Sequence, residues 1–600
     1  MQEHSTPAVI ELDPSDALSD AVLRNAEDDP DHVAFSRRSE GGWLPITAKE
    51  FATQVRQVAA GLIARGVEPG DRVAVLSRTR YEWTVCDYAI WTAGAVTVPV
   101  YETSSADQVE WILSDSGAVL AIVETPAHAA TVASVRAKVP AVTDVLVIDE
   151  GGLDQLTAAG QSVPESDLEA RRKTLGTAST ATLVYTSGTT GRPKGVQLTH
   201  GNLLFDVRTT TVDLSRLFDP LTGSTLMFLP LAHIFGRIIQ CGCVENRVRM
   251  GHSSDVKDLL GDLQAFQPTF LLSVPRVFEK VYNGAKAKAH ADGKGRIFDA
   301  AEATAISWSK AQDTGGPGLR LRAQHGLFDR LVYARLRAAM GGKITYSVSG
   351  GAPLGERLGH FYRGMGISIL EGYGLTETSA GATVNLPGAQ KVGSVGRAIP
   401  GISIEIAEDG EILLRGGNVF SSYWHNEKAT AEAITGEWFH TGDIGRVDED
   451  GYLFITGRKK ELIVTAGGKN VAPAPLEDVV RRSAVVSQCM VVGDQEPFIA
   501  ALVTIDPESW PVWLNAHGKP VGTPLVDHLT DPELLADVQQ AVDEANATVS
   551  KAEAIRKFAI LPVDFTEAGG QLTPSMKVKR NVVAEQFAKD ITGLYSGPKR

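Results

Sequence analysis

Cysteine is scarce in this chain. Four cysteines occur among 600 residues: Cys86, Cys241, Cys243 and Cys489. So few scattered thiols cannot build a disulfide framework. Two of them are separated by a single glycine, but no second cysteine or histidine pair would complete a tetrahedral metal site. We therefore expect four buried free thiols.

The chain also lacks long apolar runs and a net positive charge. No segment approaches the roughly 18 apolar residues of a membrane-spanning helix, and the first residues show neither the basic nor the apolar region of a signal peptide. The formal net charge of -14 disfavours nucleic acid as a partner. We expect a cytoplasmic protein; peripheral contact with a membrane and the oligomeric state stay open.

The length of the chain predicts more than one domain, because 600 residues exceed a single core. Apolar strand patterns over 71–77, 118–123 and 145–148 alternate with helical ones. One of these helices has a capping box at Ser105–Gln108 and a stop at Gly117. This alternation predicts a mainly parallel sheet covered by helices on both faces, with ligands at the carboxyl ends of its strands.

The sequence pattern changes twice further along the chain. A polar, weakly patterned helical stretch runs over roughly 283–322 and includes Gly315–Gly318, which we expect to be an exposed loop. From about Gly457 onward, short strand patterns such as 498–505 and a helix near 476–482 indicate a smaller α+β unit. We place the domain boundary there, with a first domain over 1–457 and a second over 458–600.

The run from Tyr185 to Gly195 is the strongest local signal. It reads Tyr-Thr-Ser-Gly-Thr-Thr-Gly-Arg-Pro-Lys-Gly and follows an apolar strand, 182–185. Glycines let backbone N–H groups approach an anion, and the hydroxyls and Lys194 add donors and charge. A plain surface turn rarely holds so many donors beside a lysine. The run therefore predicts a polyphosphate site, although Pro193 and Gly195 around the lysine exclude a Walker A loop.

Residues at five later positions could complete such a site. His233 follows an apolar strand, and Gly350–Pro353 offers flat backbone on which a planar base could stack. The segment Glu371–Thr378 combines an aromatic ring, a hydroxyl and a carboxylate, and Asp443 could accept hydrogen bonds from a ribose. Lys577, taken alone, would be read as a surface lysine.

Taken in order, these segments resemble the adenylate-forming superfamily, which includes acyl- and aryl-CoA synthetases, the adenylation domains of peptide synthetases and firefly luciferase. The resemblance spans about 29–580. Residues 229–235 and 457–473 are most similar to long-chain fatty-acid–CoA ligases, the latter particularly to the bubblegum type. The resemblance implies an α/β fold: a large N-terminal domain with mixed, mostly parallel sheets covered by helices, and a small mobile α+β C-terminal domain carrying a catalytic lysine.

The resemblance also implies a role for individual residues. The ATP phosphates would contact Thr186, Ser187, Gly188, Thr189, Thr190, Gly191 and Lys194. The rest of the nucleotide would contact Gly351, Ala352, Pro353, Glu371, Gly372, Tyr373, Gly374, Thr376, Asp443 and Arg458. The catalytic residues would be Lys577, His233, Thr376 and Glu377, with Mg²⁺ held by Glu377 and Thr189, a hinge at Lys460 and a coenzyme A channel along Gly467 and Gly468.

This chain departs from the family pattern at three positions. Arg237 stands where some members place an aromatic gate, so their gating mechanism does not carry over. Gly457 replaces an aspartate found in many members. Met576 occupies the middle of a loop that usually reads Ser-Gly-Lys.

The expected activity is that of an ATP-dependent long-chain fatty-acid–CoA ligase. The acid would first form acyl-AMP with release of pyrophosphate and then be transferred to coenzyme A, with Mg²⁺ as cofactor. The alternative is a fatty acyl-AMP ligase that delivers to a carrier protein. The absence of an obvious insertion between Gly401 and Gly457 favours coenzyme A. A catalytically silent nucleotide-binding regulator would need a damaged site, which the residues above do not indicate.

Overall fold

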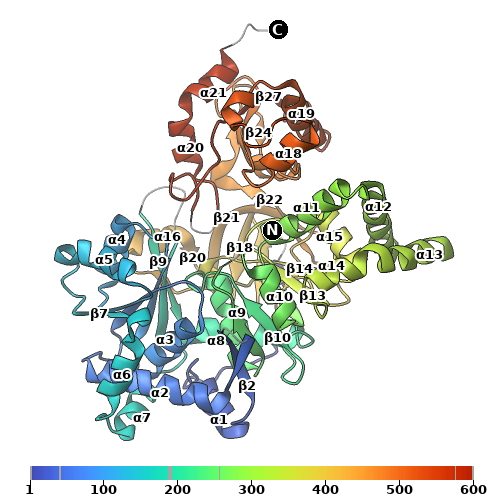
Figure 1. The fold of residues 1–600 in the computed structure, drawn as a ribbon. Helices are drawn as coiled ribbons and strands as arrows, with labels where there is room; N and C mark the ends of the chain where they lie inside the picture. Colours follow the sequence, from blue (N-terminus) through green and yellow to red (C-terminus); the bar gives the residue numbers. More distant parts are fainter. Residues whose placement is uncertain (1–2, 40–41, 187–191, 256, 574–575, 597–600) are drawn as a thin grey trace.

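The computed structural model describes residues 3–39, 42–186, 192–255, 257–573 and 576–596. Figure 1 shows a large body, a smaller C-terminal unit on one end of it, and a helical arm projecting from one side. All four cysteines are free and buried, as predicted. None of the helices in the described ranges is long and apolar enough to cross a membrane.

A seven-stranded sheet forms the centre of the N-terminal half, in the order β19-β9-β8-β5-β4-β6-β7. Its strands are β4 (Arg72–Leu76), β5 (Val96–Val100), β6 (Leu120–Val123), β7 (Asp144–Val147), β8 (Thr180–Thr186), β9 (Lys194–Thr199) and β19 (Ser422–Tyr423). Strands β4 to β8 run parallel, as predicted, whereas β9 returns antiparallel to β8 and β19 pairs antiparallel with β9. The sheet is therefore mixed and mostly parallel.

Side chains of β4 show why both faces of this sheet are covered. Val73 and Val75 belong to the core on one face, and Ala74 and Leu76 belong to the core on the other, because successive side chains of a strand alternate. The covering helices are α2 (Ala48–Ala64) and α3 (Tyr81–Thr92) on the first face, and α4 (Ala106–Ser116) and α5 (Pro126–Ser134) on the second. The capping box and the left-handed Gly117 of α4 occur as predicted.

A second, five-stranded sheet brings together the two later glycine-containing segments. Its order is β12-β13-β14-β15-β16, and its strands are β12 (Phe270–Ser273), β13 (Tyr346–Ser349), β14 (Ser368–Tyr373), β15 (Thr383–Val384) and β16 (Arg397–Ala398). Strands β13 and β14 are parallel neighbours, with Ser349 opposite Glu371. The segments that follow them, Gly350–Pro353 and Gly374–Thr378, therefore leave the same edge of the sheet.

Two further sheets complete the large body. One has the order β10-β11-β2-β3 and consists of β2 (Val33–Ser39), β3 (Gly42–Thr47), β10 (Ser224–Met227) and β11 (Arg249–His252). The other has six strands: β1 (Glu3–Ser5), β17 (Ser403–Ile406), β18 (Glu411–Arg415), β20 (Ile434–Thr435), β21 (Trp438–Val447) and β22 (Leu453–Arg458). Within it, the antiparallel register of β21 and β22 sets Asp443 opposite Arg458.

Helices surround these sheets. Those of the main body are α1 (Asp20–Asp28), α6 (Gly152–Gly160), α7 (Glu165–Arg172), α8 (His200–Asp213), α9 (Ile234–Glu245), α10 (Leu259–Phe266), α15 (Glu356–Gly364) and α16 (Glu427–Ala433). Those of the projecting arm are α11 (Pro275–Ala291), α12 (Gly295–Gln312), α13 (Leu319–Phe328), a π-helical turn at Asp329–Tyr333, and α14 (Ala334–Ala339). The predicted loop at Gly315–Gly318 lies between α12 and α13 and is largely exposed.

The C-terminal unit has its own apolar cores. It contains β23 (Ile463–Val464), β24 (Asn470–Val471), β25 (Val486–Val492), β26 (Ile499–Ile505), β27 (Ile555–Ile560), α17 (Pro473–Val480), α18 (Trp510–Ala516), α19 (Pro532–Asn546), α20 (Arg580–Gln586) and α21 (Ala588–Tyr595). Two apolar clusters, whose first buried residues are Ile463 and Met490, pack on the sheet β25-β26-β27, while the buried residues of the large cluster of the body end at Leu453. Helix α17 starts before the predicted 476, because Pro473 suits a first helical turn.

Candidate active site

The predicted phosphate-binding run begins and ends in a β-hairpin. Thr186 is the last residue of β8, and Lys194 is the first residue of β9 directly opposite it. Ser187, Gly188, Thr189, Thr190 and Gly191 lie outside the described residues. The Lys194 ammonium lies over the ring of Tyr423, 4.7 Å from its centroid. The hairpin therefore presents a hydroxyl and a cation at the carboxyl end of a central strand.

Tyr423 also connects this hairpin to the predicted metal ligand. Its hydroxyl donates a hydrogen bond of 2.7 Å to Oε1 of Glu377, and burial together with the nearby Glu377 carboxylate raises the pKa of Tyr423. Tyr423 lies on the two-residue strand β19, which pairs with β9. Sequence reasoning missed Tyr423, because a short aromatic segment distant in sequence from Lys194 and Glu377 shows no recognisable pattern.

The end of β14 and the sheet containing β21 meet at a second hydrogen-bonded group. The Tyr373 hydroxyl donates to Oδ2 of Asp443 at 2.7 Å, and Nε of Arg458 donates to Oδ1 of the same carboxylate at 2.8 Å. Burial and Asp443 raise the pKa of Tyr373 well above its ordinary value. Three predicted nucleotide-binding residues from separate parts of the sequence are thus in direct contact.

Lys577, from the C-terminal unit, lies near the group formed by Tyr373, Asp443 and Arg458. Its side chain is solvent-exposed, yet surrounding protein reduces its hydration and lowers its pKa, and the charge of Arg458 acts in the same direction. Asp443 and Glu377 oppose this shift. Electrostatic effects of this kind require the three charges to lie near the Lys577 ammonium. The residue that looked like a surface lysine therefore belongs electrostatically to the cluster.

His233 stands at the start of α9 and faces the same lysine. Its Nδ1 accepts a hydrogen bond from the Phe235 N–H at 3.1 Å, which leaves Nε2 as the protonated nitrogen. Burial, followed by the charge of Lys577, lowers its pKa to about 4. His233 is therefore neutral at physiological pH and can act there as a hydrogen-bond donor, not as a cation.

Glu371 has a different environment from its neighbours on β14. Its carboxylate is buried and accepts a hydrogen bond from the Leu354 N–H at 3.0 Å. Burial raises its pKa to about 7. Gly351, Ala352 and Pro353 just before Leu354 are exposed. Glu371 thus supports the loop that we predicted to lie against the nucleotide, and its side chain points into protein.

Several predicted residues are placed without contacts to the cluster. Lys460 lies in a short 3-10 helix, Lys459–Glu461, just after Arg458. Gly467 and Gly468 lie in an exposed turn, and a Cβ at Gly468 would meet no atom within 4 Å. Their roles as hinge and coenzyme A channel stay predictions. Gly372, Gly374 and Thr376 lie within or just after β14, beside Tyr373 and Glu377.

Arg237 is part of the buried core. It is 1% exposed and forms an ion pair with the fully buried Asp87, with Nε 2.8 Å from Oδ2. Its guanidinium also lies near the rings of Trp83 and Trp91, 5.4 and 5.3 Å from their centroids. The Arg237 side chain is buried between α3 and α9 and paired with Asp87. It therefore cannot serve as the aromatic gate that some family members have at this position.

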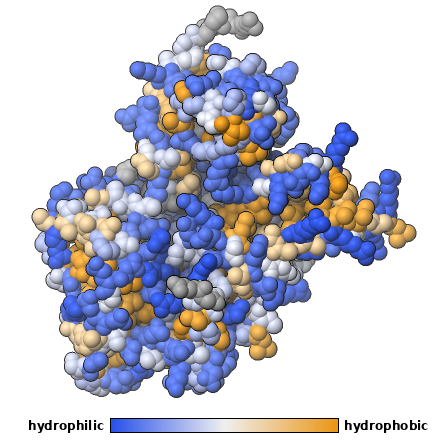
Figure 2. Space-filling model, in the orientation of Figure 1, coloured by the Kyte–Doolittle hydropathy of each residue, from blue (hydrophilic) through white to orange (hydrophobic). Residues whose placement is uncertain are grey.

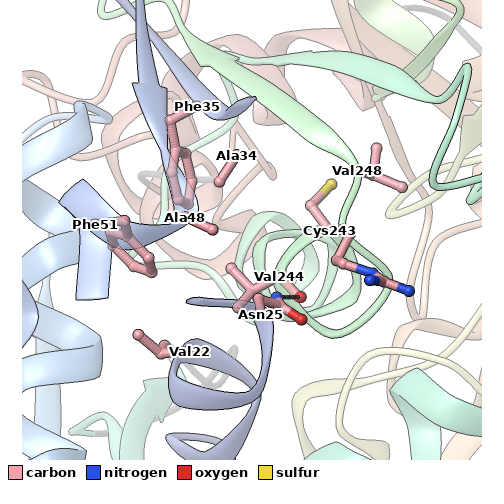
Figure 3. A pocket seen from close by; sticks show the side chains of 10 residues that line it. Val22, Asn25, Ala34, Phe35, Ala48, Phe51, Cys243, Val244 and Val248 are labelled. Carbon is pink, nitrogen blue, oxygen red and sulfur yellow. Dashed lines mark hydrogen bonds between the residues drawn. The ribbon is translucent and has the colours of Figure 1, made fainter. Parts of the chain in front are cut away.

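Two hollows lie apart from the cluster. Figure 3 shows the first, a cavity of about 10 Å³ between α1, β2, α2 and the end of α9, where Asn25 donates to the Val244 carbonyl at 2.6 Å. It holds at most one water. The second, of about 360 Å³, is lined by Arg72 and Trp424 among others, but the guanidinium of Arg72 already donates to the carbonyls of Ser116 and Gly117. Among the described residues, none of the predicted site residues lines either hollow.

The large body, its polar cluster and the smaller C-terminal unit agree with two models of one enzyme family. The chain belongs to the AMP-binding enzyme family: the model of that description matches residues 22–424, and the model described as AMP-binding enzyme C-terminal domain matches residues 460–599.

Named relatives agree with this assignment. The chain is 54% identical to the long-chain-fatty-acid–CoA ligase FadD15 of Mycobacterium bovis, over 99% of this chain and 100% of the relative. It is 32% identical to the human long-chain-fatty-acid–CoA ligase ACSBG1, over 95% of this chain and 84% of the relative. An anthranilate CoA ligase bound to anthranoyl-AMP has the same fold, with a TM-score of 0.70 at 20% identity over 96% of this chain and 98% of the other.

Proposed function

We propose that this chain is an ATP-dependent long-chain fatty-acid–CoA ligase that forms an acyl-AMP intermediate. Its family membership and the 54% identity to a ligase of that name support the substrate class. The observation that carries the mechanism is the group of Lys577, Glu377, Asp443 and Arg458, which combines residues from both units of the chain.

In the first half-reaction, a fatty carboxylate would attack the α-phosphate of ATP and displace pyrophosphate. Two anions must approach each other, so cations that offset their repulsion govern the rate. Lys194 would contact the outer phosphates from the start of β9, and Lys577 would neutralise charge between the carboxylate and the α-phosphate. Asp443 would accept hydrogen bonds from the ribose while Tyr373 and Arg458 hold it in place.

Mg²⁺ fits the residues that surround Glu377. One oxygen of this carboxylate accepts the Tyr423 hydroxyl, which leaves the other for an ion. The described residues contain no group of three or more acidic, histidine or cysteine side chains that could hold a metal, and Mg²⁺ is commonly held by one or two carboxylates together with substrate phosphates. When bound, the ion would neutralise phosphate charge.

In the second half-reaction, the thiol of coenzyme A would attack the acyl carbonyl and release AMP. We propose that residues 458–600 form a mobile domain that turns about Lys460 and withdraws Lys577, so that the thiol can enter. Separate apolar cores on the two sides of this segment support the division into 1–457 and 458–600.

The test is pyrophosphate release measured with acids of increasing chain length, each with and without coenzyme A. We expect turnover with saturated and monounsaturated long-chain acids, little with acetate or benzoate, and thioester only when coenzyme A is present. The highest specificity constant with acetate or benzoate would refute the substrate class. Acyl-AMP that accumulates unchanged in the presence of coenzyme A would favour delivery to a carrier protein.

A further inference from the structure

The outer helix of the projecting arm is attached to the molecule by one side only. It runs from Leu319 to Ala339 as α13, the π-helical turn and α14. Its inner side is held by the Tyr333 hydroxyl, which donates to the Ala301 carbonyl at 2.6 Å, and by His325, which stacks on Trp308 at 4.0 Å. These contacts fix which side of the helix faces away from the protein.

That outward side carries an apolar stripe. Leu319 is 85% exposed, Leu327 56% and Leu331 44%. Leu327 and Leu331 are four residues apart and therefore share one helix face, which exposed Ala323 and Ala334 extend in both directions. Helix α13 has no buried residue. Figure 2 shows apolar side chains exposed at the outer end of the arm with hydrophilic ones beside them.

Arginines flank the stripe and most lack a carboxylate partner. The helix contains Arg320, Arg322, Arg330, Arg335 and Arg337 against a single acidic residue, Asp329, so its formal charge is five minus one, or +4, in a chain of net charge -14. Only Arg337 pairs with that aspartate, at 2.8 Å. In the described ranges no carboxylate lies within ion-pair distance of the other four arginines.

We propose that this face of the arm, residues 319–339, docks the enzyme on the surface of a lipid bilayer that contains anionic phospholipids. A helix lying in such a surface places leucines at the boundary of the acyl chains and arginines among the headgroup phosphates. The combination on this arm matches both requirements. The surface is distinct from the nucleotide cluster and goes beyond the proposed reaction.

Charge and composition disfavour other occupants. Nucleic acid would contact the arginines but offers nothing to the leucines, and the rest of the chain repels it. A second copy of this chain, paired through the same face by a two-fold axis, would set unpaired arginines opposite arginines. An anionic lipid surface satisfies the arginines and accepts the leucines at once.

Vesicle flotation of the full chain, without substrates, tests the proposal. One set of vesicles contains phosphatidylcholine alone, and the other contains phosphatidylcholine and phosphatidylglycerol in equal parts. We expect flotation with the second set only, decreasing as salt increases. The triple variant Arg320→Glu, Arg330→Glu, Arg335→Glu should lower partitioning by about tenfold or more, because the three arginines no longer attract the anionic headgroups.

Two matched variants separate this face from general effects. Lys49→Glu, Lys173→Glu, Lys551→Glu makes the same change of charge at exposed lysines elsewhere. Leu319→Ser, Leu327→Ser, Leu331→Ser removes the stripe, and Leu44→Ser, Leu221→Ser, Val512→Ser removes equally exposed apolar side chains elsewhere.

Loss of binding in both arm variants but in neither control supports the proposal. Three results would overturn it: wild-type protein that does not float with anionic vesicles, arm and control variants that weaken flotation equally, or concentration-dependent dimers in sedimentation that the leucine variant abolishes while flotation is unchanged.

Discussion

At the scale of single residues, Tyr423 connects the two parts of the predicted phosphate and metal site. Its ring lies under the Lys194 ammonium at 4.7 Å, and its hydroxyl donates to Glu377 at 2.7 Å. Only 8% of the residue is exposed, so its position is set by packing. Glu377 can therefore keep one orientation before any ion or nucleotide binds, which favours fast turnover.

Tyr423→Phe tests this positioning role, because it removes the hydroxyl and keeps the ring under Lys194. A hydrogen bond to a charged group contributes roughly 1.5–3 kcal/mol, so we expect pyrophosphate release to slow by about tenfold or more and to need more Mg²⁺. The control is Tyr362→Phe, which removes a buried hydroxyl that donates to the Phe278 carbonyl at 2.8 Å and has no bond to Glu377 or Lys194. An unchanged Mg²⁺ requirement in Tyr423→Phe would contradict the role.

The pH dependence of adenylation should report Lys577. Surrounding protein reduces the hydration of the Lys577 ammonium and, with the charge of Arg458, lowers its pKa from 10.5; in the proposed mechanism the protonated form carries the required charge. The value of kcat/KM should therefore fall as pH rises through this lowered pKa, at a pH below 10.5. Lys577→Arg should move the fall to higher pH, because a guanidinium stays charged.

His233 should leave no trace in the same profile near neutrality, since its pKa is lowered to about 4. An alkaline limb that Lys577→Arg leaves in place would assign the titration to another group.

At the scale of elements, the turn after β14 positions Thr376 and Glu377. It contains two residues of positive φ that are not glycine, Ser379 at 56° and Ala380 at 100°. Neighbouring groups hold this strained backbone: the Ser379 hydroxyl donates to the Asn418 carbonyl at 2.8 Å, and Asp206 accepts from the Gly381 N–H at 2.9 Å. Such strain persists only where surrounding contacts enforce it.

Gly374→Ala should disrupt this turn. A Cβ at Gly374 would lie 1.8 Å from the Ala380 carbonyl oxygen, which belongs to the backbone. We expect a loss of about 1–3 kcal/mol in the free energy of unfolding and a greater loss of pyrophosphate release, because Glu377 moves with the turn.

Denaturant unfolding and the release assay measure the two effects. Gly284→Ala in α11, where a Cβ meets nothing within 4 Å, is the control and should be neutral or stabilising by about 0.5–1 kcal/mol. Wild-type activity in Gly374→Ala would contradict this account of the turn.

Local sequence patterns predicted individual helices and strands, and the order of the motifs along the chain predicted the family. The strands β4, β6 and β7, the capping box of α4 and the buried strand before the glycine-rich run follow from alternation and capping chemistry. The antiparallel return of β9, the Tyr423–Glu377 bond and the core position of Arg237 could not be predicted, because each depends on pairing between distant segments.

At the scale of the whole molecule, the contacts between the large body and the C-terminal unit include polar pairs near the surface. Lys280 pairs with Glu508 at 2.7 Å, Arg276 with Asp506 at 3.4 Å, and the Thr103 hydroxyl donates to Glu567 at 2.6 Å. Exposed pairs of this kind contribute little to stability. They fit an interface that can separate while each unit keeps its own core.

The loop that carries Lys577 belongs to the C-terminal unit, which we propose to be mobile. The Lys577 N–H donates to the Thr573 hydroxyl at 3.0 Å. Met576, which directly precedes the lysine, has a φ of 63°. The family's usual glycine would adopt that conformation without strain. The arrangement seen here, in which Arg458, Asp443 and Glu377 act electrostatically on Lys577, is the one that we propose for adenylation.

The most direct test of this account supplies synthetic acyl-adenylate and coenzyme A to variants and follows acyl-CoA, alongside pyrophosphate release from ATP and the acid. Lys577→Ala should abolish adenylation and retain thioester formation. Lys460→Pro should do the reverse, because proline fixes φ at the proposed hinge, and Lys589→Ala on the exposed side of α21 should retain both. Equal loss of both half-reactions in a folded Lys577→Ala protein would contradict the use of one site by two domain arrangements.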